Sequence, residues 1–370
     1  MIDEAPRGDT AGGSRAFGFT GTWQAYAPIA FTNLLLTIVT LGIYTFWART
    51  RTRRYLWSQT RFIDDRLEWT GTGLELFIGY MLAIVFFVVP FAIINLVLQG
   101  VLLRGHAGFA GLIVGALYLL LLYLIGVAIF RALRYRLTRT YWHGIRGGSD
   151  DAGFRYGLSY FWRTLLGSAA LGLMIPWSMT TLWNKRWSAM SFGSSSFHAE
   201  AEWKPIFPRF LLFYIAPIAM IVIVAIFAGA AAGLGSLTSF PASPGPGTIA
   251  TFIIAALVFY LLFFGVLGLI AMIYYSAFFR EAIGALTLGK LSFSFDATTM
   301  DWVKLYLGNL ALVVFTLGIG LIFVPYRNWA FFIRHMEAFG DVVLDDFTQS
   351  TTRTPRQGEG LLDAFDVGAF

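Results

Sequence analysis

Four long apolar stretches, separated by short polar segments, dominate the chain and predict four membrane-crossing helices. A helix needs roughly 20 apolar residues to cross the hydrocarbon core of a bilayer, and each stretch is long enough. The stretches pair as two hairpins, 74–99 with 109–129 and 207–233 with 249–278. Proline, glycine and serine residues between the last two stretches indicate a turn.

Three shorter apolar segments, 33–47, 163–177 and 309–323, align on a shared Leu-Gly pair. Each has a polar residue eight positions before that leucine and an aromatic residue six positions after it; the polar residues are Asn33, Arg163 and Asn309. Self-similarity of this kind indicates internal repeats. We expect two full repeats and a truncated third one, at 17–148, 149–290 and 291–347. The ends, 1–16 and 348–370, are predicted to be disordered cytoplasmic tails.

Basic residues indicate how the Leu-Gly segments lie in the membrane. Lys and Arg concentrate in 49–66, 131–163 and 185–209, and cytoplasmic loops carry such an excess. If the Leu-Gly segments crossed the membrane, the last two basic segments would lie on opposite faces. We therefore expect these segments to dip in and return at Gly42, Gly172 and Gly318, where glycine permits an unusual backbone. Four crossings with both termini cytoplasmic are predicted, and seven crossings is the alternative.

Short segments of aromatic residues alternating with small polar ones predict strands. They lie at 17–22, 66–72, 154–156, 197–203, 291–295 and 342–347. Because a lone strand is marginal in stability, we expect these segments to pair into a small sheet. The predicted fold class is an all-α polytopic membrane protein with short cytoplasmic β-strand segments.

Composition supports a membrane protein. The chain is 57% hydrophobic and 13% charged, whereas ordinary globular chains carry about 25% charged residues. It has no cysteine, which excludes disulfides and thiolate metal sites. The net charge of +6 comes from basic residues that flank membrane segments, so we do not expect nucleic-acid binding. The first 16 residues lack the basic region of a cleaved signal peptide.

Four motifs resemble the YjgN-like family of bacterial inner-membrane proteins. They are Thr40-Leu-Gly-Ile-Tyr-Thr-Phe-Trp-Ala-Arg49, Arg53-Arg-Tyr-Leu-Trp57, Thr60-Arg-Phe62 and Gly71-Thr-Gly-Leu-Glu-Leu-Phe77. Together with the similar segments later in the chain, the resemblance covers residues 17–347. Met174 and Gly320 stand where the first Leu-Gly segment has Tyr44. The resemblance implies a multi-pass inner-membrane protein. It supplies no catalytic residues, since the family's molecular function is undefined.

Polar residues and prolines within the apolar segments form a candidate intramembrane site. Polar groups inside a membrane are candidates for a functional role, and prolines at matched repeat positions indicate the binding site of a transporter. The candidates are Asn33, Glu75, Pro90, Asn95, Arg163, Pro217 and Asn309. Simpler explanations remain: a carboxylate can complement a helix dipole, an amide can satisfy broken backbone, and a proline can merely kink its helix. Gly111 and Gly115 have the spacing of a helix-packing face.

A basic, tryptophan-rich segment is predicted to be an interfacial helix that contacts anionic lipid head groups. Its residues are Trp47, Arg49, Arg51, Arg53, Arg54 and Trp57. The alternative is that these charges only orient the chain. The four histidines lack the helical spacing of a metal site, and we expect no metal or cofactor.

Two functional classes follow from this pattern. The first is transport or permeation of a small solute or lipid. The second is a non-transporting scaffold or sensor whose basic cytoplasmic face binds anionic lipid or a partner protein. An enzyme is not expected, because the chain shows no nucleophile, acid–base pair or metal cluster. Substrate and oligomeric state stay open, including a homo-oligomer.

Overall fold

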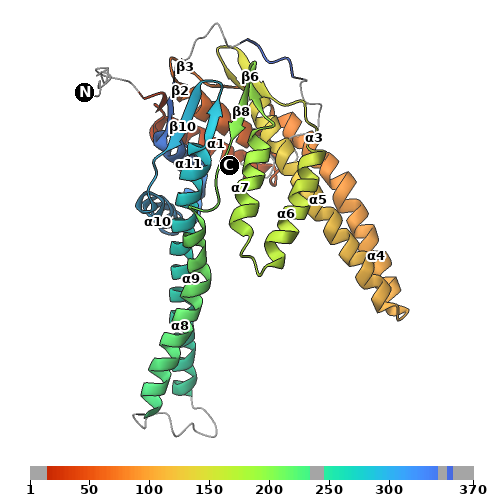
Figure 1. Ribbon diagram of the computed structural model, residues 1–370, viewed down its shortest axis with the longest axis vertical. Coiled ribbons are helices and arrows are strands. Elements are labelled where there is room, and N and C mark those ends of the chain that lie inside the picture. Colours follow the sequence, from red (N-terminus) through yellow and green to blue (C-terminus); the bar gives the residue numbers. More distant parts are fainter. Residues whose placement is uncertain (1–14, 234–245, 341–347, 353–370) are drawn as a thin grey trace, which may run out of the picture.

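The computed structural model describes residues 15–233, 246–340 and 348–352. A head made of strands and helix ends lies at one end of the molecule, and two pairs of long helices extend from it (Figure 1). Three shorter helix hairpins are also connected to the head. The position of each helix hairpin depends on the strands to which it is attached.

The strands form two antiparallel sheets in the head. A three-stranded sheet has the order β1-β2-β3, and an eight-stranded sheet runs from β4 to β11 in chain order. The strands of the first are β1 (Phe17–Phe19), β2 (Thr60–Phe62) and β3 (Asp65–Arg66). Those of the second are β4 (Glu68–Trp69), β5 (Thr140–Trp142), β6 (Ile145–Gly148), β7 (Ser191–Phe192), β8 (Ser195–Ala199), β9 (Leu286–Leu288), β10 (Leu291–Phe295) and β11 (Met336–Phe339). The sheet is larger than the sequence predicts.

The helices are inserted between strands that pair with each other. The first short hairpin, α1 (Trp23–Val39) and α2 (Thr45–Ser58), joins β1 to β2. The second, α6 (Phe154–Ala169) and α7 (Ile175–Trp187), joins β6 to β7, and the third, α10 (Thr299–Phe315), η2 (Ile319–Phe323) and α11 (Val324–His335), joins β10 to β11. Because the flanking strands are neighbours, each hairpin must return to the level from which it started.

The two long hairpins have the same kind of attachment. The first joins β4 to β5 and consists of α3 (Gly73–Ala83), the π-helix η1 (Ile84–Val88), α4 (Val89–Leu103) and α5 (Ala107–Arg139). The second joins β8 to β9 and consists of α8 (Phe207–Gly233) and α9 (Pro246–Gly284).

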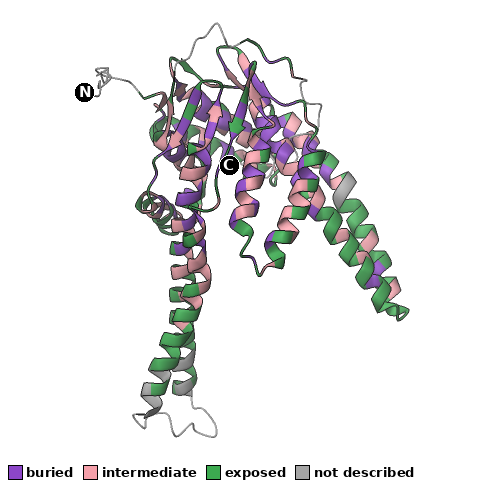
Figure 2. Cartoon of the chain, viewed as in Figure 1, coloured by how far each residue is buried: buried purple, intermediate pink, exposed green. Residues whose placement is uncertain are grey.

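The long helices are suited to a membrane by length and surface. Among the described residues, Ala107–Arg139, Phe207–Ile226 and Ile253–Gly284 are long and apolar enough to cross one. Helix α3, η1 and α4 follow one another without a break and together span roughly 45 Å. Figure 2 shows that the long hairpins are mostly exposed along their length. Leu112 and Leu261 are each 74% exposed, and extended exposed apolar surface marks contact with a membrane or with another protein.

Each short hairpin turns at its Leu-Gly pair, where the sequence predicts a backbone break. The leucine and the glycine both have positive φ, for example 50° at Leu41 and 92° at Gly42. Thr40 closes the first turn: its hydroxyl donates to the Leu36 carbonyl at 2.7 Å and accepts from the Tyr44 amide at 2.9 Å. The threonine before the third Leu-Gly pair bonds in the same way. The organisation into repeats stays a prediction.

Several predicted strands differ in the structure. Residues 154–156 are the first turn of α6 rather than a strand, because Gly153 adopts a left-handed conformation that starts the helix. Tyr156 is buried there, with its ring centroid 5.5 Å from that of Phe130. The segments 17–22, 66–72 and 197–203 contain strands shorter than predicted, 291–295 is a strand throughout, and 342–347 lies outside the described residues.

Of the predicted tails, residues 1–14 and 353–370 lie outside the described part of the chain. Residues 348–352 pack against the β5–β6 turn. Gln349 donates to the Gly144 carbonyl at 2.8 Å, and the Arg146 guanidinium donates to the Thr352 carbonyl. This end of the chain is therefore held to the head as far as Thr352.

Aromatic side chains hold the hairpins together beneath the head. Trp57 of α2 stacks on Trp329 of α11 with ring centroids 4.0 Å apart, and its indole N–H donates to Thr140 of β5 at 2.9 Å. Phe279 of α9 stacks on Trp302 of α10 at 5.5 Å. Since these contacts link elements far apart in the chain, the first and third short hairpins are fixed beside α5 and α9.

Candidate ligand cavity between the hairpins

A large cavity lies between the first and third short hairpins and the long helices α5 and α9. Its volume is about 1090 Å³, slightly above the range of roughly 300–1,000 Å³ typical of ligand sites. Helix α5 contributes residues near the end that joins the sheet, whereas those of α9 extend from Phe279 back to Gly268. The apolar lining includes Leu34, Leu133, Met272, Phe279 and Ile322.

The charged residues that line the cavity are all basic. Arg49 and Arg53 come from α2 and Arg136 from α5, and none of the described lining residues is Asp or Glu. Arg53 is 8% exposed and Arg136 is 9% exposed. The Arg53 guanidinium lies over the Trp69 ring, 5.1 Å from its centroid. The cavity thus combines a mostly apolar wall with buried positive charge.

A further buried arginine interacts with Arg136 without lining the cavity. Arg186 of α7 is buried, and burial lowers the pKa of its guanidinium. The nearby charge of Arg136 lowers that pKa further, against an opposing effect of Tyr156.

Two of the three polar residues at the matched repeat position form hydrogen bonds within their own hairpins. The Asn33 amide group donates to the Ala48 carbonyl at 3.1 Å, and its oxygen accepts from Arg51 at 3.3 Å. In the third hairpin the Asn309 oxygen accepts from Arg327 at 2.6 Å, across the same spacing of 18 residues. Each asparagine therefore links the two arms of its hairpin.

The second hairpin differs at the matched position. Its first arm carries Arg163 in place of asparagine, and the position 18 residues later is Thr181. The Arg163 guanidinium lies over the Trp177 ring at 5.6 Å, and its Nε is buried without a hydrogen-bond partner among the described residues. The three matched residues thus do not converge on one pocket. Only Asn33 lines the cavity.

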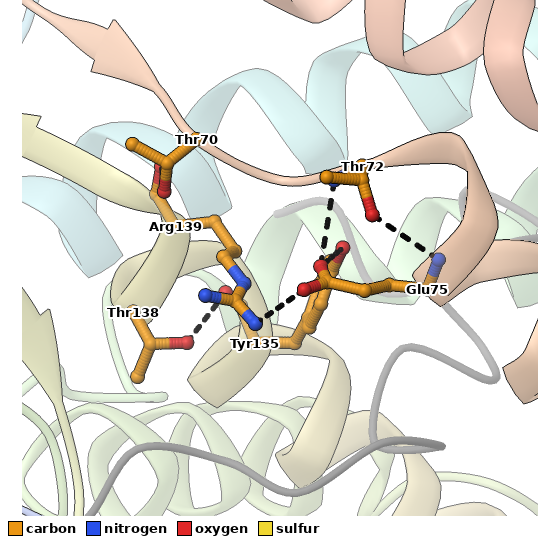
Figure 3. Close-up of polar contacts among 6 residues, drawn as sticks. All are labelled: Thr70, Thr72, Glu75, Tyr135, Thr138 and Arg139. Carbon is orange, nitrogen blue, oxygen red and sulfur yellow. Dashed lines mark hydrogen bonds and ion pairs between the residues drawn. The ribbon is translucent and has the colours of Figure 1, made fainter.

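Glu75 stabilises the start of α3 and links it to α5, as Figure 3 shows. Its carboxylate accepts from Arg139 at 2.7 Å and from the Tyr135 hydroxyl at 3.0 Å. It also forms a capping box with Thr72, in which each side chain bonds the backbone of the other. This carboxylate at a helix N-terminus complements the helix dipole.

The other candidates on the long hairpins lie away from the cavity. Asn95 is exposed and donates to the Phe91 carbonyl of its own helix at 3.0 Å. Pro90 follows the π-helix, where the Val89 amide bonds to Ile84, five residues back. Helix α8 continues through Pro217 without a break in the helix. None of these residues lines the cavity, so the structure does not assemble the predicted intramembrane site.

The predicted head-group residues do not share one exposed surface. Arg53 and Trp57 are buried, and Arg51 is engaged with Asn33 and the Tyr44 hydroxyl. Arg54 is exposed. Helix α2 is therefore packed inside the protein rather than laid on a membrane surface, and its basic residues point in several directions.

Similarly, Gly111 and Gly115 do not pack on another helix. A Cβ atom built on either glycine would meet no atom of the described chain within 4 Å. The close crossing of α5 occurs instead at Gly126, where a Cβ would lie 2.5 Å from Tyr160 of α6.

Sequence reasoning missed the contributions of α5, α9 and α11 to the cavity. The sequence indicates Arg136 only as one of the basic residues that set the orientation of the chain in the membrane. However, Leu133, Arg136, Leu137 and Thr140 have the spacing of one helical face. That spacing was the available signal. Tyr275 and Asn328, which also line the cavity, carry no comparable local signal. No group of three or more His, Asp or Glu that could hold a metal occurs among the residues with described positions.

The fold and the cavity define a class of membrane proteins in which helix hairpins are attached to paired strands of two antiparallel sheets. The chain belongs to the family described as "Bacterial protein of unknown function (DUF898)", whose model matches residues 14–364. The family relationship indicated by the first Leu-Gly segment is thereby confirmed.

The chain is similar to two proteins that are named as bacterial inner-membrane proteins. The chain is 30% identical over 130 residues to "Inner membrane protein YjgN" of Salmonella typhimurium, a match that covers 35% of this chain and 30% of the relative. It is 33% identical over 133 residues to the protein of the same name from Escherichia coli K12, with 36% of this chain and 30% of the relative covered. The matches thus span less than a third of each relative. No solved structure matches the chain.

Proposed function

We propose that this protein is a multi-pass inner-membrane protein that takes a small solute or lipid from the bilayer into the cavity between its hairpins, as part of transport or permeation. The cavity of about 1090 Å³ is the observation that carries the proposal. It is bounded by α5 and α9, which are two of the apolar helices long enough to cross a membrane. A molecule dissolved in the bilayer therefore has a short path to it.

The attachment of the hairpins supports four membrane crossings. Strands β6 and β7 pair through Gly147 with Phe192, although the second short hairpin separates them in sequence. Two paired strands cannot lie on opposite sides of a bilayer, so this hairpin returns to its starting side. The same holds for the first and third short hairpins. The basic head then lies in the cytoplasm by the excess of Lys and Arg.

A non-transporting scaffold receives less support from the geometry. That function was predicted from the basic cytoplasmic face, and within its Trp47–Trp57 segment Arg53 and Trp57 are buried. Arg49, Arg53 and Arg136 line the cavity, and basic residues inside a cavity favour a bound small molecule over a docked protein.

A pair of matched variants tests the proposed function. Ala271→Trp places a large side chain on the cavity wall, whereas Ala255→Trp places it on the exposed face of the same helix. Native mass spectrometry of gently extracted protein should show a bound small molecule in the wild type and in Ala255→Trp. Ala271→Trp should lose it. If no variant carries a bound molecule, or if both tryptophan variants keep it, the cavity is not a ligand site.

A further inference from the structure

A second, smaller pocket lies where the second long hairpin joins the head. The start of α8, the residues just before it and the C-terminal part of α9 form its lining, which consists of Pro205, Ile206, Arg209, Ala277, Arg280 and Glu281. The volume of this pocket is about 220 Å³, below the roughly 300–1,000 Å³ of sites for drug-sized ligands. The pocket therefore has room for a small charged group and not for a large solute.

The pocket lies at the boundary between the apolar hairpin and the charged head. Arg209 and Arg280 are the charged residues on either side of the stretch 210–279, which contains no Asp, Glu, Lys or Arg. They therefore mark the two ends of the segment that is suited to the hydrocarbon core. Trp203 and Phe207, next to the lining residues in sequence, contact each other with ring centroids 5.6 Å apart. Because tryptophan is enriched where a membrane meets water, the pocket lies at the level of the lipid head groups.

Charges of both signs line this pocket without pairing with each other. Arg209 donates to the Pro205 carbonyl at 3.0 Å, which leaves most of its five N–H groups unused. The Glu281 carboxylate accepts from the Glu202 amide at 3.0 Å through one oxygen, Oε1. Within the described part of the chain, Arg280 forms no hydrogen bond or ion pair, and neither arginine pairs with Glu281. The pocket thus presents two positive charges and one negative charge to a ligand.

We propose that this pocket binds the head group of phosphatidylethanolamine, with the phosphate at Arg209 and Arg280 and the ammonium at Glu281. A guanidinium fork matches the oxygens of a phosphate group, and an ammonium group donates charge-assisted hydrogen bonds to a carboxylate. The acyl chains then lie along the hairpin, whose surface beyond the pocket is apolar and mostly exposed (Figure 2). The pocket shares no lining residue with the cavity between the hairpins, so this inference does not depend on the proposed function.

Two related phospholipids each lack one part of this complementarity. Phosphatidylcholine carries a quaternary ammonium, which has no N–H group to donate to Glu281. Phosphatidylglycerol has no cationic group, so its phosphate leaves the Glu281 carboxylate unpaired beside it. Arg209 is exposed and Arg280 and Glu281 are half-buried, so water screens these differences and keeps them modest. We expect phosphatidylethanolamine to bind about fivefold more tightly than either lipid with the same acyl chains.

Native mass spectrometry of the purified full chain with titrated lipid measures the three affinities, and this comparison needs no variant. Glu281→Gln removes the negative charge but keeps an oxygen that can accept from Glu202, and it should abolish the preference over phosphatidylglycerol. Arg280→Gln should weaken the binding of phosphatidylethanolamine about fivefold. Lys204→Gln is the matched control, because Lys204 is exposed, close in sequence and outside the pocket lining. It should change that affinity by less than about twofold.

Four results would overturn the proposal. Equal affinities for the three lipids would refute the head-group assignment. A loss in Lys204→Gln as large as that in Arg280→Gln would mean that the basic surface attracts lipid without a defined site. Soluble phosphoethanolamine carries the same charges without acyl chains, and if it binds as tightly as the lipid, the ligand is a soluble molecule. Ala271→Trp fills the other cavity and should leave phosphatidylethanolamine bound, whereas loss of the lipid in that variant would place it in the cavity.

Discussion

The crossing of α5 and α6 at Gly126 gives the sharpest test of the packing. A Cβ atom at Gly126 would lie 2.5 Å from Tyr160 Cβ and 3.0 Å from Gly157 Cα. Carbon atoms pack favourably at about 3.5–4.0 Å. The variant Gly126→Ala must therefore push α6 away from α5 by about 1 Å.

The expected loss of stability follows from comparison with a second glycine of the same helix. A Cβ atom added at Gly115 would have no atom of the described chain within 4 Å, so Gly115→Ala is the matched control. Both substitutions gain up to about 1 kcal/mol of helix propensity, which cancels in the difference. Overpacking costs about 1–3 kcal/mol. Gly126→Ala should therefore be less stable than Gly115→Ala by that amount.

Thermal unfolding in detergent measures this difference. In a chain of this size 1 kcal/mol corresponds to a shift of about 1.3 °C in Tm. We expect the Tm of Gly126→Ala to lie about 1–4 °C below that of Gly115→Ala. Equal Tm values would refute the close contact of α5 with α6. A lower Tm for Gly115→Ala would show that the packing face lies at Gly111 and Gly115 after all.

Two further substitutions test the polar contacts. Glu75→Gln removes the charge that Arg139 pairs with at 2.7 Å and should lower the stability by about 1–3 kcal/mol, read as a fall in Tm; an unchanged Tm would mean that the pair is not formed. Asn309→Leu leaves Arg327 without its acceptor and should cost a similar amount, whereas Asn95→Leu, on an exposed face, should cost little. Equal losses at Asn309 and Asn95 would contradict the hairpin contact.

The parts of the fold that depend on local chemistry could be predicted from sequence. The apolar stretches identify the long helices because length and hydrophobicity are properties of a single segment. The turn at Leu41 and Gly42 is likewise local, since the glycine permits the left-handed conformation and Thr40 closes the turn through its own neighbours. The long helices lie where the sequence predicts them, and the differences are in their first and last residues: α5 is predicted at 109–129 and spans Ala107–Arg139.

The sheet and the cavity depend on contacts between distant residues. Strands of two residues, such as Ser191–Phe192, have no usable pattern and exist only because β6 and β8 pair on either side. Trp57 was predicted at a lipid surface because its neighbours are basic, but stacking on Trp329 buries it. The cavity combines residues from Tyr26 to Phe332, and no single segment contains enough of it to reveal it.

Four membrane crossings require every short hairpin to return to the side of the membrane where it began. The chain has no cysteine, so single cysteines can be placed at Asp65, Ser194 and His106. In right-side-out vesicles an impermeant maleimide should label His106→Cys, at the tip of the first long hairpin, and leave Asp65→Cys and Ser194→Cys unlabelled until the membrane is opened. Seven crossings would place Asp65 and Ser194 on opposite faces, so labelling of either one in sealed vesicles would contradict the four-crossing topology.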